Sequence, residues 1–453
     1  MPRLAHHESS GAPAILERVA RRPVRTLTLM FGLCVAVFLA TVPLPRADQQ
    51  LIGSDGIRYY LYVHSLVIDG DLDFRNEWTH FAGKAPADTP AGRPPNILPI
   101  GTGLVWTPFF LAAHTVSGLL GLPTDGYGSV YQAAVCLGSM LYGFIGLLLT
   151  YALSREYADR TSALVAVVLL WFAGNVAYYM VIEPSMSHMA SLGTVSALLA
   201  WWRLRRARST MGYWIGIGAL GGLAATIRPQ DALFLVLPAM HWTIEAGHRL
   251  RGGRGGHFGV HLAHGAGMAC AAALLFSIQL WAWWVVFGSV RGGGYFSMPG
   301  AGFDWFDPRL VAVLFSPYHG LFLWHPIYLA GAIGWWFLAQ RDRAYAAALM
   351  IGVALQVYVV AAWRFWWQGD AFGGRTLIAS VPIFAIGLAL LVQRLRRRSS
   401  ALVTVPGAVL LLWNFALLLQ YRLGFMPRDK PSLQQVLWGK FTLLVSLWDR
   451  LFR

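Results

Sequence analysis

An acidic stretch at residues 53–77 holds the residues best suited to chemistry. Its sequence, GSDGIRYYLYVHSLVIDGDLDFRNE, contains five of the 21 acidic residues in this 453-residue chain, and it closely follows the first long apolar segment. A carboxylate held at a membrane surface can remove a proton from a hydroxyl group. Asp55 is the candidate base, because it lies closest to the apolar segment and Gly56 would let the backbone approach a substrate. The alternative is a solvated loop after a membrane anchor.

The residues after Asp55 predict a helix that lies along a membrane interface. The pattern from Ile57 to Ile68 is amphipathic and aromatic, as such helices are. Tyr59 is therefore a candidate cavity residue. The later acids are predicted to be solvated, capping or turn residues: Asp69, Asp71 and Asp73.

A second polar group lies at residues 363–375, with the sequence WRFWWQGDAFGGR. An aromatic belt at a membrane interface would explain part of it. Glycines surround Arg375, and a guanidinium beside a bendable backbone suits a phosphate, which arginine can bind through two hydrogen bonds. Trp367 and Asp370 are further candidates for the wall of the same cavity.

Three other segments carry candidates of the same kind. Arg228 precedes Pro229 at a predicted turn and is a second candidate for phosphate binding. Glu183 and His188 begin another apolar segment, where they either line the same cavity or cap helix ends. The glycine-rich loop 291–308 is either a mobile flap over a site or a flexible connector.

Motifs for other kinds of chemistry are missing from the sequence. It has no metal-ligand spacing, phosphate loop, nucleotide fingerprint or Ser-His-Asp signature. We therefore expect no metal and no other cofactor. A lipid-linked activated group would supply the energy for a reaction at these residues.

The composition predicts an all-α polytopic membrane protein. Apolar residues make up 56% of the chain and charged residues 13%, whereas a soluble protein carries about a quarter charged residues. Apolar runs of about 17–25 residues recur, which is the length that crosses a bilayer as a helix. The formal charge of +15 lies mainly in short basic runs between apolar segments, so it indicates orientation in the bilayer and not nucleic-acid binding.

The positive-inside rule orients the chain with a cytoplasmic N-terminus. The predicted divisions are a basic leader (1–26), a first transmembrane helix (27–44), an outer loop with juxtamembrane helices and the candidate base (45–127), a transmembrane bundle (128–421) with outer loops 291–308 and 364–375, and an amphipathic tail (422–453).

The number of crossings before the basic run 203–208 must be even, because both it and the leader are cytoplasmic. Five apolar segments precede this run, so one of them does not cross. Residues 98–120, interrupted by proline and glycine, are predicted to lie at the outer face. This count predicts about eleven transmembrane spans. The candidate polar residues all lie at the outer ends of these spans, and this shared location favours a cavity that opens outward.

Several stretches resemble those of the GT-C membrane glycosyltransferases, in particular bacterial members of the protein O-mannosyltransferase and aminoarabinose-transferase group. These stretches are DGIRYYLYVHSLVIDGDLDF, EPSMSH, IRPQDALF, SPYHGLFLWHP and WWQGDAFGGR. The resemblance covers most of the chain in architecture, through loose motifs. It implies a GT-C bundle with surface helices in the first outer loop. It also implies inverting transfer from a polyprenyl-phosphate sugar, with an early outer-loop aspartate, here Asp55, as the base.

Two positions depart from the pattern of that family. Gly56 stands where the mannosyltransferases carry a second acid. The segment 92–96, GRPPN, replaces a lysine or His-Pro-Pro element, which makes Arg93 another candidate phosphate partner. The acceptor hydroxyl, on a glycan, a lipid or a protein, stays open.

The predicted function is sugar transfer at the outer face of a bacterial plasma membrane. In this hypothesis Asp55 deprotonates the acceptor, and Arg375 and Arg228 stabilise the departing lipid phosphate. A transporter or flippase of a lipid-linked glycan is the alternative, although no internal repeat is evident and few acids lie within spans. A non-catalytic scaffold of the same fold is the third possibility.

Overall fold

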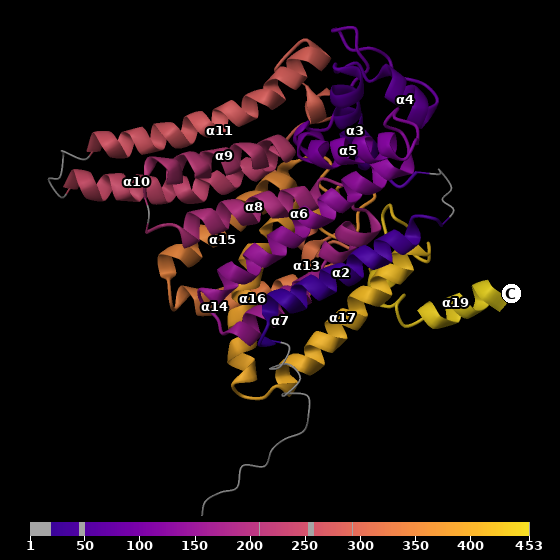
Figure 1. Ribbon diagram of the computed structural model, residues 1–453. Coiled ribbons are helices and arrows are strands. Elements are labelled where there is room, and N and C mark those ends of the chain that lie inside the picture. The colour runs from indigo at the N-terminus through magenta and orange to yellow at the C-terminus, as the bar shows by residue number, and fades with distance from the viewer. Residues whose placement is uncertain (1–19, 45–49, 208, 252–257, 292, 453) are drawn as a thin grey trace, which may run out of the picture.

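The chain folds into a bundle of helices (Figure 1). A computed structural model describes residues 20–44, 50–207, 209–251, 258–291 and 293–452. Among these residues the only β-pairing is an isolated bridge between Phe303 and Trp363. The prediction of an all-α membrane protein is therefore confirmed.

Three helices of the predicted first outer loop gather at one end of the bundle in Figure 1. After α2 (Pro23–Thr41) come α3 (Asp55–His64), which continues as a π-helical turn (Ser65–Asp69), then α4 (Arg75–Ala82) and α5 (Gly101–Leu119). Their depth relative to a bilayer, including that of α5, stays a prediction.

The remaining helices form the body and the C-terminal end of the bundle. They are α6 (Ser129–Arg155), α7 (Arg160–Ala173), α8 (His188–Leu204), α9 (Met211–Ile227), α10 (Val236–Arg251), α11 (Phe258–Phe287), α12 (Leu310–Phe315), α13 (Leu321–Trp324), α14 (Ile327–Ala339), α15 (Arg343–Ala362), α16 (Val381–Arg396), α17 (Ala401–Arg422), α18 (Leu433–Leu437) and α19 (Leu443–Phe452). Short 3₁₀ helices precede α10 (Pro229–Leu235) and α16 (Arg375–Ser380).

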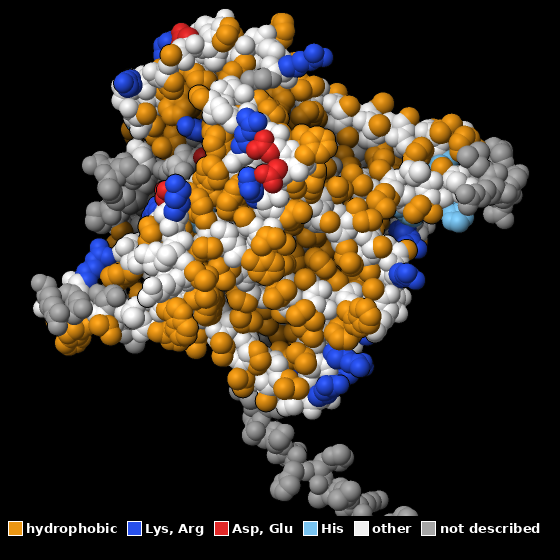
Figure 2. Space-filling view, turned by 180° about the vertical axis from the view of Figure 1, so that it is seen from behind, with side chains coloured by type: hydrophobic (Ala, Val, Ile, Leu, Met, Phe, Trp, Pro, Cys, Tyr) orange, Lys and Arg blue, Asp and Glu red, His pale blue; other side chains and the backbone are white. Residues whose placement is uncertain are grey.

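Six of the described helical segments are long and apolar enough to cross a membrane. They are α2, α6, α11, α15, α17, and α16 together with the 3₁₀ turn before it. The helices α7, α9 and α14 are apolar but shorter, so the predicted count of about eleven spans stays a prediction. Figure 2 shows hydrophobic side chains over much of one face of the bundle, as lipid contact requires.

The segment that contains α16 lies at the centre of the bundle. Of its most apolar window, 89% is buried, against 17% for α2 and 22% for α17. Glycines allow its close packing on α14: a Cβ on Gly334 would lie 1.9 Å from the carbonyl oxygen of Gly387. Such contacts between small residues are a common way for membrane helices to associate. The start of this central segment is Arg375, which is thereby fixed relative to the whole bundle.

The tyrosines of α3 face the protein interior, and the position of this helix along a membrane interface stays a prediction. Tyr60 and Tyr62 are fully buried, and their hydroxyl groups donate to the backbone oxygens of Gly126 and Leu98. A tyrosine whose hydroxyl finds a backbone acceptor can be buried completely. This packing ties α3 to the segments on either side of α5.

Candidate active site

An ion pair joins the start of α3 to the start of the central segment. Arg375 Nη2 lies 3.3 Å from Asp55 Oδ2, and both side chains are only partly accessible (14% and 28% exposed). Asp55 is the first residue of α3, where the helix dipole favours a negative charge. Two segments far apart in the sequence thus bring a carboxylate and a guanidinium into contact.

A second arginine beside this pair contacts a histidine. Arg228, at the end of α9, lies with Nη1 2.7 Å from Nδ1 of His188. A guanidinium only donates hydrogen bonds, so Nδ1 accepts and the buried His188 ring is neutral. No described carboxylate lies within ion-pair distance of Arg228. The buried carboxylate of Asp231, three residues further on, still acts on the charge of Arg228 without forming an ion pair.

These groups share one cavity of about 560 Å³, a size typical of small-molecule sites. Asp55, Arg58, Arg228 and Arg375 provide its charged wall. Its remaining wall is largely apolar and aromatic and includes Leu98, Met186, Trp283, Tyr295, Phe296, Phe303, Trp363, Phe365, Trp366 and Trp367. The cavity can therefore take a ligand that has an anionic group beside apolar or ring-shaped parts.

Two predicted outer loops pair with each other over this cavity. The Phe303–Trp363 bridge joins loop 291–308 to loop 364–375, and the Arg364 N–H donates to the Gly302 carbonyl oxygen at 3.1 Å. Arg364 Nε also contacts Asp304 Oδ1 at 3.0 Å. Loop 291–308 lines the cavity, as a flap would, and its mobility stays a prediction.

A layer of glutamines supports Arg375, and the sequence patterns did not indicate it. Gln368 Oε1 accepts from the Thr376 N–H at 2.9 Å, and Gln230 Nε2 donates to the Thr376 carbonyl oxygen at 2.7 Å. Gln356 Oε1 accepts from Gln230 Nε2. Gln368 itself has a positive φ of 70°, an uncommon conformation often found at functional sites. The one sequence feature that could have indicated these glutamines is the position of Gln230, two residues after the candidate Arg228.

The predicted site residues separate into those on the cavity and those away from it. The cavity is lined by Asp55, Arg375, Arg228, His188, Tyr59 and Trp367. Tyr59 donates to Ser187 Oγ at 3.0 Å, and burial, followed by the charge of Asp55, raises the pKa of Tyr59, so it stays a donor.

Arg93, Glu183 and Asp370 do not line the cavity. Arg93 Nη1 donates to the backbone oxygen of Val285, and Glu183 accepts from the Tyr178 hydroxyl group at 2.8 Å. Asp370 is exposed beside the aromatic loop. These three residues therefore lie off the cavity wall, although the charge of Glu183 still acts on Arg375.

Gly56 serves packing and not the approach of a substrate, contrary to the expectation from sequence. A Cβ at this position would lie 2.3 Å from the Oγ of Ser185, which is closer than real atoms approach. The missing side chain therefore makes room for Ser185. A second acid beside Asp55, as in the mannosyltransferases, would collide with the same residue.

The fold is similar to that of ArnT from Cupriavidus metallidurans. The apo structure gives a TM-score of 0.53 at 14% identity, covering 93% of this chain and 70% of ArnT. The structure bound to undecaprenyl phosphate gives 0.53 at 15% identity, covering 92% and 69%. This likeness confirms the GT-C fold predicted from the motifs.

A weaker match is to the archaeal oligosaccharyltransferase AglB from Archaeoglobus fulgidus, in complex with an inhibitory peptide and a dolichol-phosphate. Its TM-score is 0.45 at 13% identity, covering 93% of this chain and 54% of AglB. No protein-family model and no curated protein matches this chain in sequence.

Proposed function

We propose that the chain is a membrane glycosyltransferase that moves a sugar from a polyprenyl-phosphate donor to an acceptor hydroxyl group. One observation carries the proposal: a partly exposed carboxylate, Asp55, faces a single largely apolar cavity together with three arginines, Arg58, Arg228 and Arg375. Arginine side chains suit a phosphate, which they bind through paired hydrogen bonds. The likeness in fold to ArnT, solved with undecaprenyl phosphate, supports this class of donor.

The reaction needs one base and one site for the leaving phosphate. Asp55 takes the proton of the acceptor hydroxyl as its oxygen forms a bond to the anomeric carbon. The bond from that carbon to the phosphate oxygen breaks on the opposite face, so the configuration inverts. The electron pair of the broken bond leaves with the polyprenyl phosphate. Arg375 and Arg228 stabilise the negative charge that develops on this phosphate.

The Asp55–Arg375 ion pair would then control the base. In an inverting reaction the base and the leaving phosphate lie on opposite sides of the sugar, so a contact of 3.3 Å must open. The donor phosphate competes with Asp55 for Arg375. Binding of the donor therefore frees Asp55 to accept a proton, and Arg228 is available for a second phosphate oxygen.

The distribution of basic residues supports an outward-facing cavity. The helix α8 begins at His188 on the cavity and has Arg203 in its last turn. The central segment begins at Arg375 and has Arg394 and Arg396 in its last turn. Because basic residues favour the cytoplasmic side, the cavity ends of both segments are assigned to the outer face of a bacterial plasma membrane, with the N-terminus cytoplasmic.

Substitution of the base tests the proposal. In membranes supplied with a panel of radiolabelled undecaprenyl-phosphate hexoses and pentoses, Asp55→Asn should lower sugar transfer about 10²–10⁴-fold. Asp73→Asn, an acid of the same stretch that lies off the cavity, is the matched control and should keep full activity. Full transfer by Asp55→Asn would exclude Asp55 as the base.

Reconstitution in liposomes separates this function from the two alternatives. Transfer of label to an extractable acceptor supports the enzyme. Movement of the labelled lipid between leaflets without transfer would favour a transporter. Binding of undecaprenyl phosphate with neither transfer nor movement, for every donor in the panel, would favour a scaffold.

A further inference from the structure

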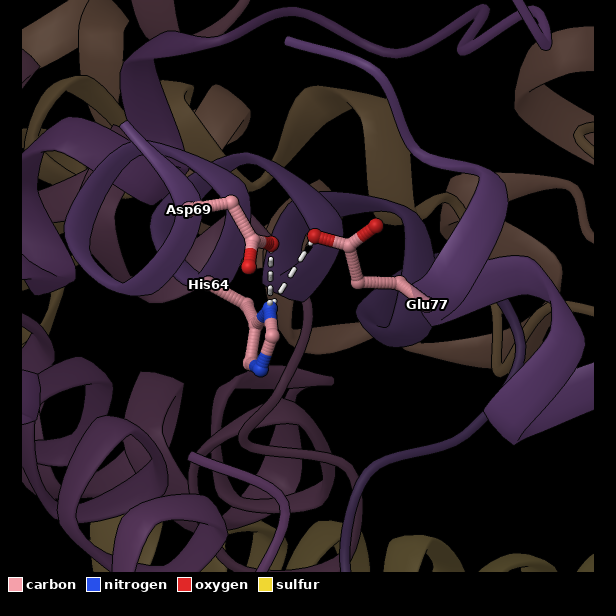
Figure 3. A group of neighbouring side chains, drawn as sticks. All are labelled: His64, Asp69 and Glu77. Atoms are coloured by element: carbon pink, nitrogen blue, oxygen red, sulfur yellow. Dashed lines mark hydrogen bonds and ion pairs between the residues drawn. The ribbon is translucent and has the colours of Figure 1, made fainter. Parts of the chain in front are cut away.

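A second polar cluster lies at the opposite end of α3 from Asp55. It consists of His64, the last residue of α3, with Asp69 from the π-helical turn and Glu77 from α4. His64 Nδ1 is 3.0 Å from Glu77 Oε1 and 3.5 Å from Asp69 Oδ2. Figure 3 shows both carboxylates directed at this one ring nitrogen.

The hydrogen bond of the other ring nitrogen, Nε2, determines whether Nδ1 of a neutral His64 carries a hydrogen. Nε2 of His64 lies 2.8 Å from the backbone oxygen of Asp125, which can only accept, so Nε2 carries a hydrogen. In a neutral imidazole Nδ1 is then a bare lone pair. Two carboxylate oxygens face this lone pair, and the three acceptors repel one another unless a cation lies among them.

Burial makes the negative charge costly. Glu77 is completely buried and His64 is 1% exposed, and Glu77 Oε2 has no hydrogen-bond partner among the described residues. A buried, charged carboxylate with one oxygen unpartnered is unfavourable. A proton on Nδ1 would compensate only one of the two negative charges and would leave Oε2 without a partner. A divalent cation compensates both.

We propose that His64, Asp69 and Glu77 bind a divalent transition-metal ion, with Zn²⁺ as the preferred ion. An imidazole nitrogen with two carboxylates is a ligand set that Zn²⁺ accepts, usually with water in the fourth position. Asp69 is 28% exposed, so water can reach the ion from its side. Imidazole ligation disfavours Mg²⁺, which prefers oxygen ligands alone.

The spacing of the ligand atoms fits such an ion. All three lie within 4.8 Å of one another. Bonds of about 2.0–2.2 Å around a tetrahedral ion separate ligand atoms by roughly 3.3–3.6 Å. The observed 3.0 and 3.5 Å need only small side-chain movements to reach these values.

The groups around the ligands have the form of an outer metal shell. A metal-bound histidine usually donates its other N–H to a carbonyl or carboxylate, as His64 donates to Asp125. Asn76 Nδ2 donates to Asp69 Oδ2 at 3.0 Å and orients that carboxylate. These contacts hold the ligands in place before an ion binds.

The ion would position α3 and take no part in the reaction. It would join the end of α3 to α4, while Asp55 begins the same ten-residue helix about 13 Å away. The inference goes beyond the proposed function and does not depend on it, because metal content is measured without any substrate.

Metal content of the full chain tests the inference. The protein, purified with a histidine-free affinity tag, is loaded with Zn²⁺, desalted and analysed by mass spectrometry of the elements. The wild type should retain about one Zn²⁺ per chain. Glu77→Gln, which keeps the side-chain size, should lose most of it, and the matched control Asp73→Asn should keep it.

Further measurements guard against misfolding and adventitious metal. Size-exclusion chromatography and circular dichroism check each variant, and if Glu77→Gln does not fold, the less buried Asp69→Asn replaces it. EDTA should lower the unfolding temperature of the wild type and leave that of the Glu77 variant unchanged. X-ray absorption should show nitrogen and oxygen ligands only.

Three results would overturn the inference. The first is a wild type that retains no more Zn²⁺ than the Glu77 variant. The second is sulfur coordination, which would assign the ion to a cysteine. The third is retention of Mg²⁺ in preference to Zn²⁺ in parallel loadings.

Discussion

The two ends of α3 differ in the charged side chains that gather there. At its first residue, Asp55 faces Arg375, and Arg228 lies on the wall of the same cavity. At its last residue, His64 faces two carboxylates, Asp69 and Glu77. One short helix thus joins arginines that suit an anion to carboxylates that suit a cation.

The ends also differ in access, and this difference indicates how each charge is compensated. The Asp55 end opens on a cavity of about 560 Å³, so its anion can enter and leave as a substrate does. At the other end Glu77 is completely buried, so its cation would stay bound. A turnover site and a resident-ion site need these opposite arrangements, and perturbing one end should leave the other intact.

The largest effect on ligand binding is expected from Arg375→Ala. Hydrogen bonds to charged groups contribute about 1.5–3 kcal/mol, so the affinity for undecaprenyl phosphate should fall about 10–100-fold. Titration of the protein in lipid nanodiscs with undecaprenyl phosphate measures this affinity, with undecaprenol as the ligand that lacks the phosphate. Arg375→Lys should lose part of the affinity, because lysine keeps the charge without the paired donors.

Glu77→Gln is the control from the opposite end of α3. It should bind undecaprenyl phosphate as the wild type does while it loses Zn²⁺. Normal binding of undecaprenyl phosphate by Arg375→Ala would exclude Arg375 from the phosphate site. An equal loss of binding in Glu77→Gln would show that the two ends are not separate sites.

The next largest effect concerns the packing that holds the Asp55 end. Gly56→Ala should destabilise the protein by about 1–3 kcal/mol, because the added Cβ would overlap Ser185. Thermal unfolding in detergent measures the loss. Ser185→Gly in the same chain removes the two closest atoms and should restore part of the stability.

Gly53→Ala is the matched control, since a Cβ at Gly53 would meet no atom within 4 Å. Its unfolding temperature should equal that of the wild type. A Gly56→Ala protein as stable as this control would show that contact with Ser185 does not fix the start of α3.

The sequence was informative about the Asp55 end because membrane topology restricts where charged residues can lie. Polar residues at the same ends of several apolar segments are expected to share a cavity, and Asp55, Arg228 and Arg375 do line one. The fold class followed from the apolar runs. The roles of these residues stay predictions.

Side-chain environments could not be predicted in the same way. Arg93 and Glu183 have local partners, the Val285 carbonyl and the Tyr178 hydroxyl group, that no pattern indicates. The five-residue spacing of His64 and Asp69 matches no metal-ligand motif, because the two residues meet only through the π-helical turn between them. Such contacts depend on backbone geometry and tertiary packing.

The smallest predicted effect is an increase in the affinity for undecaprenyl phosphate. It distinguishes an Asp55 that competes with the phosphate for Arg375 from an Asp55 that only holds Arg375 in place. If Asp55 and the donor phosphate compete for Arg375, then Asp55→Asn frees the guanidinium. Partly exposed ion pairs contribute about 0.2–1 kcal/mol, so undecaprenyl phosphate should bind up to about fivefold more tightly, although sugar transfer is lost.

Undecaprenol binding should not change in Asp55→Asn, and Asp73→Asn should change neither ligand. A carboxylate that merely held Arg375 in place would give the opposite sign, because its loss would let the arginine move and weaken phosphate binding. Tighter binding together with lost transfer requires that Asp55 both compete for Arg375 and act in the reaction. Weaker binding would assign Asp55 to the support of Arg375, and the cavity would then need another base.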